Sequence, residues 1–143
     1  MARYAVAALT GAGSTVLPII SLYASASTRP RIRELALFNT GAAAVQLKLA
    51  RLTTAGTTGT ALTEMPLVPE DPPALAAAFN THSAGPTITA GDLYRLYLPA
   101  GGGTILTFPD QGLVIPMLAN NGIGVVVSTG TGQICEATLI WDE

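Results

Sequence analysis

The chain has 143 residues, of which 49% are hydrophobic and only 11% charged, with a formal net charge of −2. This composition excludes a disordered chain, which would be polar and rich in charge. No apolar run approaches the roughly 18 residues that a membrane-spanning helix needs. We therefore expect one domain over residues 1–143. Because few charges are available to cover its surface, part of that surface should be buried against a partner, most simply further copies of the chain.

Period-two patterns and β-forming residues predict strands in the first part of the chain. The expected strands are Tyr4–Leu9, Val16–Tyr23, Arg31–Phe38 and Val45–Leu52. Pro18 places the second of these at a sheet edge. A hairpin-type loop at Thr53–Thr60 should lead into a strand at Ala61–Met65. The proline-rich segment 66–73 is predicted to be a surface loop.

The second part of the chain contains the only plausible helix, one or two turns at Ala74–Phe79 with Asp71 as its N-cap. The remaining expected strands are Asp92–Leu98, Thr104–Phe108, Leu113–Pro116, Gly122–Ser128 and Gln133–Trp141. The last two are apolar on both faces, so we expect them at the centre of a sheet or covered by another subunit.

These elements give about eight or nine short strands with turn signals every 8–12 residues, the spacing of sandwiches and barrels. The sequence therefore predicts an all-β fold, a single-domain β-sandwich of two four-stranded sheets with at most one short helix. The arrangement that fits this count is a jelly roll.

Arg29, Arg31 and Arg33 alternate along one predicted strand, so their guanidinium groups should share a face. We interpret them as candidate partner-binding residues that form ion pairs at an interface. A solvated strand start and nucleic-acid binding are alternatives, but the acidic chain has no further basic stripe. Because the same face continues into leucine residues, the strand is predicted to bend near Glu34, for instance at a bulge.

Charge is divided unevenly along the sequence. Residues 1–51 hold six basic residues and one acid, whereas residues 52–143 hold one basic residue and eight acids. Either the two halves form complementary faces that meet in an assembly, or they interleave in the fold and the division has no further meaning.

No residue pattern indicates catalysis. Cys135 is the only cysteine and is expected to be a small buried side chain, and His82 is the only histidine that could activate it. The available carboxylates look like loop or turn residues: Glu64, Glu70, Asp71, Asp92 and Asp110. No spacing is typical of a metal site. We expect no enzyme, no cofactor and no metal.

Several segments together resemble small virion proteins of tailed bacteriophages, of the jelly-roll capsid decoration (cement) type. The segments are Arg31–Thr40, Val45–Thr57, Ala78–His82, Phe108–Pro116, Asn121–Val125 and Trp141–Glu143. The resemblance is one of overall style across most of the chain. It implies a homotrimer on the capsid exterior, assembled in the host cytoplasm, that binds the major capsid protein and stabilises the shell, without contacting nucleic acid or a membrane.

A second function class is a receptor- or carbohydrate-binding head module of a phage fibre. Sugar sites stack an exposed aromatic ring on the sugar, and the candidates are Tyr94, Tyr97 and Trp141. Each lies in a predicted strand and is expected in the core. An exposed Tyr97 or Trp141 beside a polar groove would favour this alternative.

Overall fold

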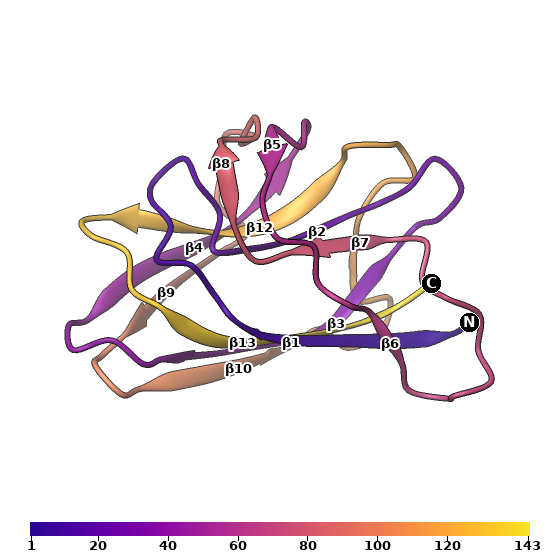
Figure 1. Ribbon diagram of the computed structural model, residues 1–143, viewed down its shortest axis with the longest axis horizontal. Helices are drawn as coiled ribbons and strands as arrows, with labels where there is room; N and C mark the ends of the chain where they lie inside the picture. The colour runs from indigo at the N-terminus through magenta and orange to yellow at the C-terminus, as the bar shows by residue number, and fades with distance from the viewer.

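Alternating apolar residues place most of the chain in two antiparallel sheets stacked face to face, which form the lower and upper layers in Figure 1. The computed structural model describes residues 1–143 and contains no helix. Sheet A, the lower layer, consists in order of β10 (Gly103–Thr107), β3 (Arg31–Asn39), β13 (Cys135–Asp142), β1 (Arg3–Leu9) and β6 (Met65–Pro66), with β11 (Leu113–Val114) also paired to β3. Sheet B consists in order of β7 (Ala77–Phe79), β2 (Ile20–Tyr23), β12 (Gly122–Thr129), β4 (Val45–Leu52) and β9 (Tyr94–Leu98).

The order of the eight principal strands identifies the topology. Counted along the chain, the first, eighth, third and sixth lie side by side in sheet A as β1, β13, β3 and β10. The second, seventh, fourth and fifth lie side by side in sheet B as β2, β12, β4 and β9. This interleaving of two Greek keys is a jelly roll. The predicted all-β sandwich is confirmed, and the observed strand order is that of a jelly roll.

The core lies between the sheets and follows from side-chain alternation. In β4, Val45, Leu47 and Leu49 are buried in the core and Gln46 is exposed. Tyr4 and Trp141 stack at the centre of sheet A with ring centroids 5.8 Å apart, and Trp141 is fully buried as predicted. Strands β12 and β13 each pair with a strand on both sides, which confirms their central position.

The predicted bend in the arginine-rich strand is confirmed as a β-bulge. Ile140 of β13 lies opposite Glu34, whereas the next residue, Trp141, lies opposite Ile32. Arg33 is therefore the extra residue of β3. The bulge lets Ile32 and Leu35 both face the core while Arg33 reaches the outer face of the sheet.

The predicted helix at Ala74–Phe79 is wrong, because Ala77–Phe79 forms strand β7 beside β2. A helix this short is not stable by itself and needs tertiary contacts to form. Here the tertiary contacts favour an extended chain. The carboxylate of Glu143 accepts hydrogen bonds from the N–H groups of Leu75 and Ala76, and Glu64 accepts one from Ala78.

Three further predictions are wrong. Only Met65–Pro66 of the segment around Ala61–Met65 forms a strand, and it pairs with β1. The Thr53–Thr60 segment contributes β5 (Thr57–Thr58), which pairs with β8 (His82–Ala84) far along the chain. Strand β2 begins at Ile20, after Pro18, and lies between β7 and β12, so it is not an edge strand.

The long connection between β4 and β9, residues 53–93, contributes β6 to sheet A and β7 to sheet B, and part of it lies outside sheet B. Its β5–β8 ladder rises above the upper layer, whereas no strand lies outside the lower layer (Figure 1). Val126 lies between the core residues Val125 and Val127, so its side chain points to the outer face of sheet B. It is nevertheless fully buried. No segment of the chain forms a helix capable of crossing a bilayer.

Candidate interaction face

The outer face of sheet A, which we call the bare face, carries exposed apolar side chains in register across the strands. One row runs through Ile105, Ala36, Thr138 and Ala7 on four adjacent strands; Ile105 and Ala7 are exposed, Thr138 is partly exposed and Ala36 is buried. The apolar and threonine side chains on this face are Ala5, Ala7, Leu9, Ala36, Phe38, Met65, Ile105, Thr107, Val114, Thr138 and Ile140.

The exposure of this face is substantial. Ile105 is 55% exposed, Leu9 52% and Met65 60%. Apart from Asp142 at one end, Glu34 and Glu136 are the only acidic side chains within its rows. A contiguous apolar surface of this kind, built on a rigid sheet, is typical of a surface that another macromolecule covers.

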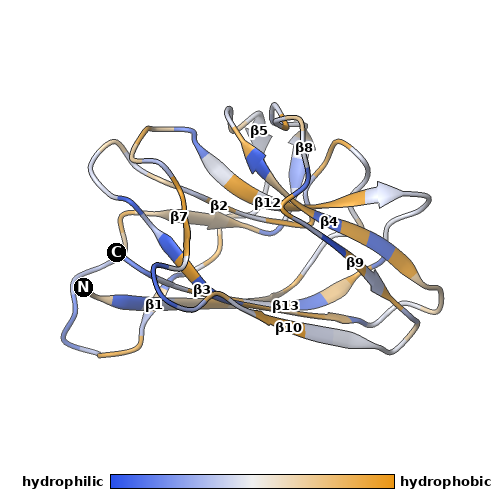
Figure 2. Cartoon of the chain, turned by 180° about the vertical axis from the view of Figure 1, so that it is seen from behind, coloured by the Kyte–Doolittle hydropathy of each residue, from blue (hydrophilic) through white to orange (hydrophobic).

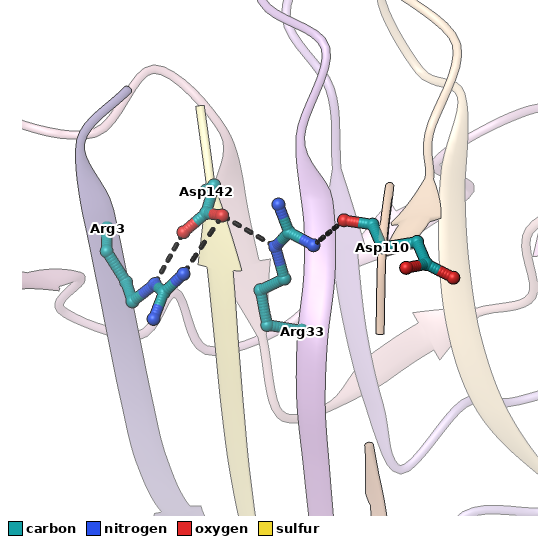
Figure 3. Close-up of polar contacts among 4 residues, drawn as sticks. All are labelled: Arg3, Arg33, Asp110 and Asp142. Atoms are coloured by element: carbon teal, nitrogen blue, oxygen red, sulfur yellow. Dashed lines mark hydrogen bonds and ion pairs between the residues drawn. The ribbon is translucent and has the colours of Figure 1, made fainter. Parts of the chain in front are cut away.

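An arginine cluster closes one end of the bare face (Figure 3). Asp142, the last residue of β13, lies between Arg3 on β1 and Arg33 on β3. Arg3 donates from Nε to Oδ1 at 2.6 Å and from Nη2 to Oδ2 at 3.2 Å, and Arg33 donates from Nε to Oδ2 at 2.6 Å. Arg33 also donates from Nη1 to the backbone carbonyl of Asp110.

The cluster holds Asp142 ionised. The hydrogen bond from Arg3 is the largest cause of the lowered pKa of Asp142; burial opposes it, and Arg33 adds to it. The carboxylate in turn raises the pKa of Arg3. Since one carboxylate faces two guanidinium groups here, and Arg31 lies directly opposite Asp142 in the strand register without an ion pair, this end of the face carries net positive charge.

The three predicted partner-binding arginines do not behave alike. Arg33 is engaged within the chain by Asp142, whereas Arg31 and the exposed Arg29 make no side-chain hydrogen bond or ion pair. Their role toward a partner stays a prediction. Sequence reasoning missed Arg3 and Asp142. The signal that could have found them is the jelly-roll topology itself, in which the first and last strands lie side by side and bring Arg3 opposite Asp142.

Ion pairs join the two oppositely charged halves of the sequence within one molecule. Arg3 and Arg33 pair with Asp142, and Lys48 pairs with Asp92 at 3.2 Å. Asp92 also accepts a hydrogen bond from Arg95 at 2.8 Å, and this bond is the largest cause of its lowered pKa. The structure therefore agrees with the interleaved interpretation of the charge division.

His82 of β8 lies on the outer side of sheet B, where it is buried against β2. Its Nε2 is 2.9 Å from Oγ of the fully buried Ser21, and burial lowers the pKa of the imidazole. Its Nδ1 has no hydrogen-bond partner. No carboxylate completes a catalytic triad with this pair, and Ser21 has no access to solvent. The pair is a buried polar contact between β2 and β8.

Two aromatic residues expected in the core lie at the surface instead. Tyr97 is 66% exposed and Tyr94 46%, since β9 is the edge strand of sheet B. Tyr97 lies opposite Gln46 on the outer face of that sheet. The thiol of Cys135 is buried as predicted, and burial raises its pKa.

The surface depressions of the molecule are shallow and open. The largest, about 590 Å³, lies near the chain ends and is lined partly by Tyr4, Asp71 and Glu143. No protein-family model matches the chain, and no curated protein matches it either. The fold and the bare face together define the class of protein. It is a jelly-roll sandwich in which the outer face of sheet B is covered, whereas the outer face of sheet A is bare and has the arginine cluster at one end.

Proposed function

We propose that the protein is a structural virion component that docks through its bare face. In this proposal it decorates a tailed-phage capsid, binds the major capsid protein as an oligomer and stabilises the shell. The observation that carries the proposal is the combination of an exposed apolar sheet face with arginine side chains that have no partner in the chain. The resemblance of the sequence to capsid decoration proteins supplies the partner.

The chemistry of the face specifies what the partner should present. Apolar area on the partner would cover the rows around Ile105 and Ala7, where each buried square ångström contributes roughly 25 cal/mol before the costs of association. Acidic side chains on the partner would meet Arg31 and Arg29, which are free to form bidentate pairs. Arg33 is already paired with Asp142 and is not expected to contribute directly.

Co-sedimentation with capsid shells assembled without this protein tests the proposal. Ala7→Arg places a long charged side chain in the middle of the bare face and should weaken binding by about tenfold or more. Ala84→Arg is the matched control, an exposed alanine on β8 above the other sheet. Arg31→Glu should also weaken binding, most strongly at low salt. Undiminished binding of both Ala7→Arg and Arg31→Glu would exclude the bare face as the docking surface.

The exposure of Tyr97 favours a second candidate, carbohydrate binding by a phage-fibre head module. The ring is free to stack on a sugar, and Gln46 and Arg95 lie beside it in the strand register. A glycan array followed by Tyr97→Ala distinguishes the two functions. Binding that disappears in Tyr97→Ala and persists in Ala7→Arg would replace the capsid proposal.

A further inference from the structure

Strand β10 ends sheet A and leaves a row of backbone groups without partners. The hydrogen bonds at the two ends of β10 show which groups these are. The N–H of Asn39 donates to the carbonyl of Gly102, and the N–H of Phe108 donates to the carbonyl of Arg33, each at 2.8 Å. Because hydrogen-bonded pairs alternate along an antiparallel ladder, Thr104 and Leu106 face β3. Gly103, Ile105 and Thr107 therefore turn their N–H and C=O groups away from the sheet.

This edge has none of the features that usually prevent strand pairing. Its sequence is Gly-Thr-Ile-Leu-Thr, with no charged residue and no proline, and its register with β3 is uninterrupted. The other sheet edges differ. Strand β6 has two residues and includes Pro66, and β9 carries Arg95. In Figure 2 the strong blue of β9 contrasts with the pale and orange colours of β10.

The edge is complementary to itself. When two copies of β10 run antiparallel about a two-fold axis at Ile105, Gly103 faces Thr107 of the second copy and Thr104 faces Leu106. The outward groups of residues 103, 105 and 107 then all find partners. Two Ile105 side chains meet on the bare face, where each is otherwise 55% exposed. Cross-strand β-branched pairs of this kind are favourable.

Charge does not oppose this pairing. The end of β10 that carries Asp110 would lie beside the Pro99–Gly102 turn of the second copy, which has no charged residue. No like charges are therefore placed opposite each other along the paired edge.

We propose that β10 is the edge through which two copies of the chain join their A sheets into one continuous sheet. The pairing also joins the two bare faces into a single larger surface. The inference rests on the edge alone and does not require a capsid. It predicts a two-fold dimer, whereas the resemblance to decoration proteins implies a trimer.

Sedimentation equilibrium over a range of concentrations tests the proposed dimer. Ile105→Lys is the test variant. The wild-type chain should be a dimer, and Ile105→Lys, which places two lysines opposite each other, should weaken dimerisation at least about tenfold. Tyr97→Lys, an equally exposed edge residue on β9, should remain dimeric. Far-UV circular dichroism checks that each variant is folded.

Hydrogen exchange supplies a second measurement on the unchanged chain. The N–H groups of Ile105 and Thr107 should become more protected as the protein concentration rises, whereas those of β9 should not. A monomer, a trimer or a dimer that Ile105→Lys leaves intact would each overturn the inference. A trimer that still binds capsids through the bare face would leave the proposed function standing.

Discussion

The two outer faces of the sandwich differ in whether the chain itself covers their apolar side chains. Both faces carry apolar side chains that point away from the core, such as Val126 on sheet B and Ile105 on sheet A. On sheet B, His82 from the connection between β4 and β9 contacts Ser21, and both Ser21 and Val126 are fully buried. On sheet A nothing in the chain covers Ile105, Leu9 or Met65, each of which is more than half exposed.

This difference shows which outer face a single chain buries and which it leaves exposed to solvent. The covered face contains buried polar groups, including the Ser21–His82 contact, that serve the stability of a single chain. The bare face gains nothing from its apolar rows within one chain. Their contribution appears only when a second molecule excludes water from them.

The largest expected effect compares the same charge on the two faces. Val126→Lys buries an ammonium group directly opposite Lys48 and should lower the free energy of unfolding by about 4 kcal/mol or more. Leu9→Lys on the bare face lies opposite Glu136 and should change it by about 0.5 kcal/mol or less. Urea unfolding of both variants measures the contrast. Similar losses in both would mean that the bare face is also covered in the isolated chain.

A smaller effect is expected at the arginine cluster. Asp142→Asn removes the carboxylate shared by Arg3 and Arg33 and should cost about 2 kcal/mol of unfolding free energy. Because Arg3, then Arg33, lowers the pKa of Asp142 in the folded state, its contribution is complete above about pH 4 and is lost as the pH falls through the lower folded value.

Thermal unfolding between pH 2 and 7 measures this contribution. The wild type should lose stability below about pH 4 more steeply than Asp142→Asn. Arg3→Gln is the milder control, because half of that side chain is already solvent-exposed. Equal acid sensitivity in the wild type and Asp142→Asn would show that the cluster does not stabilise the fold.

His82 should make the covered face sensitive to mild acid. Burial lowers the pKa of His82, so stability is complete above the unfolded value of about 6.5 and decreases as the pH falls through the folded value. Thermal unfolding between pH 7 and 5 should show this loss in the wild type. His82→Gln retains a donor toward Ser21 and should flatten this part of the profile. A steep decrease that persists in the variant would assign it to another group.

Tyr23 gives the smallest effect and the opposite pH dependence. Burial raises the pKa of Tyr23 to about 12, so its contribution is complete below about pH 10 and decreases as the pH rises toward that value. The hydroxyl is buried without a hydrogen-bond partner. Tyr23→Phe should therefore be neutral or stabilising by up to about 1 kcal/mol at pH 7, and it should remove the alkaline decrease. A destabilised variant would reveal a hydrogen bond that the hydroxyl makes.

The sequence correctly predicted those strands whose own residues show a clear pattern. Val45–Leu52 matches its predicted bounds, and the bulge near Glu34 follows from arginines and leucines that could not otherwise share a strand. The jelly-roll class also followed from strand number and turn spacing. Errors occurred where local preference is weak, as at Ala77–Phe79, whose backbone N–H groups are bound by the distant carboxylates of Glu64 and Glu143.

The candidate site was predictable only in part. The sequence singled out Arg29, Arg31 and Arg33, but it could not distinguish them, because the partner of Arg33 lies 109 residues away in the chain. Tyr97 was misplaced for a related reason. A period-two pattern shows that a residue lies in a strand, but it does not show whether the strand is at the edge of its sheet.

The sequence by itself determined that this chain is an all-β sandwich with too few charges to cover its surface, because alternation and composition are local properties of the residues. The tertiary structure alone decided which outer face is covered and which is bare. That choice depends on where residues 53–93 pack, and it is made by contacts between segments far apart in the chain, such as Ser21 with His82 and Arg3 with Asp142.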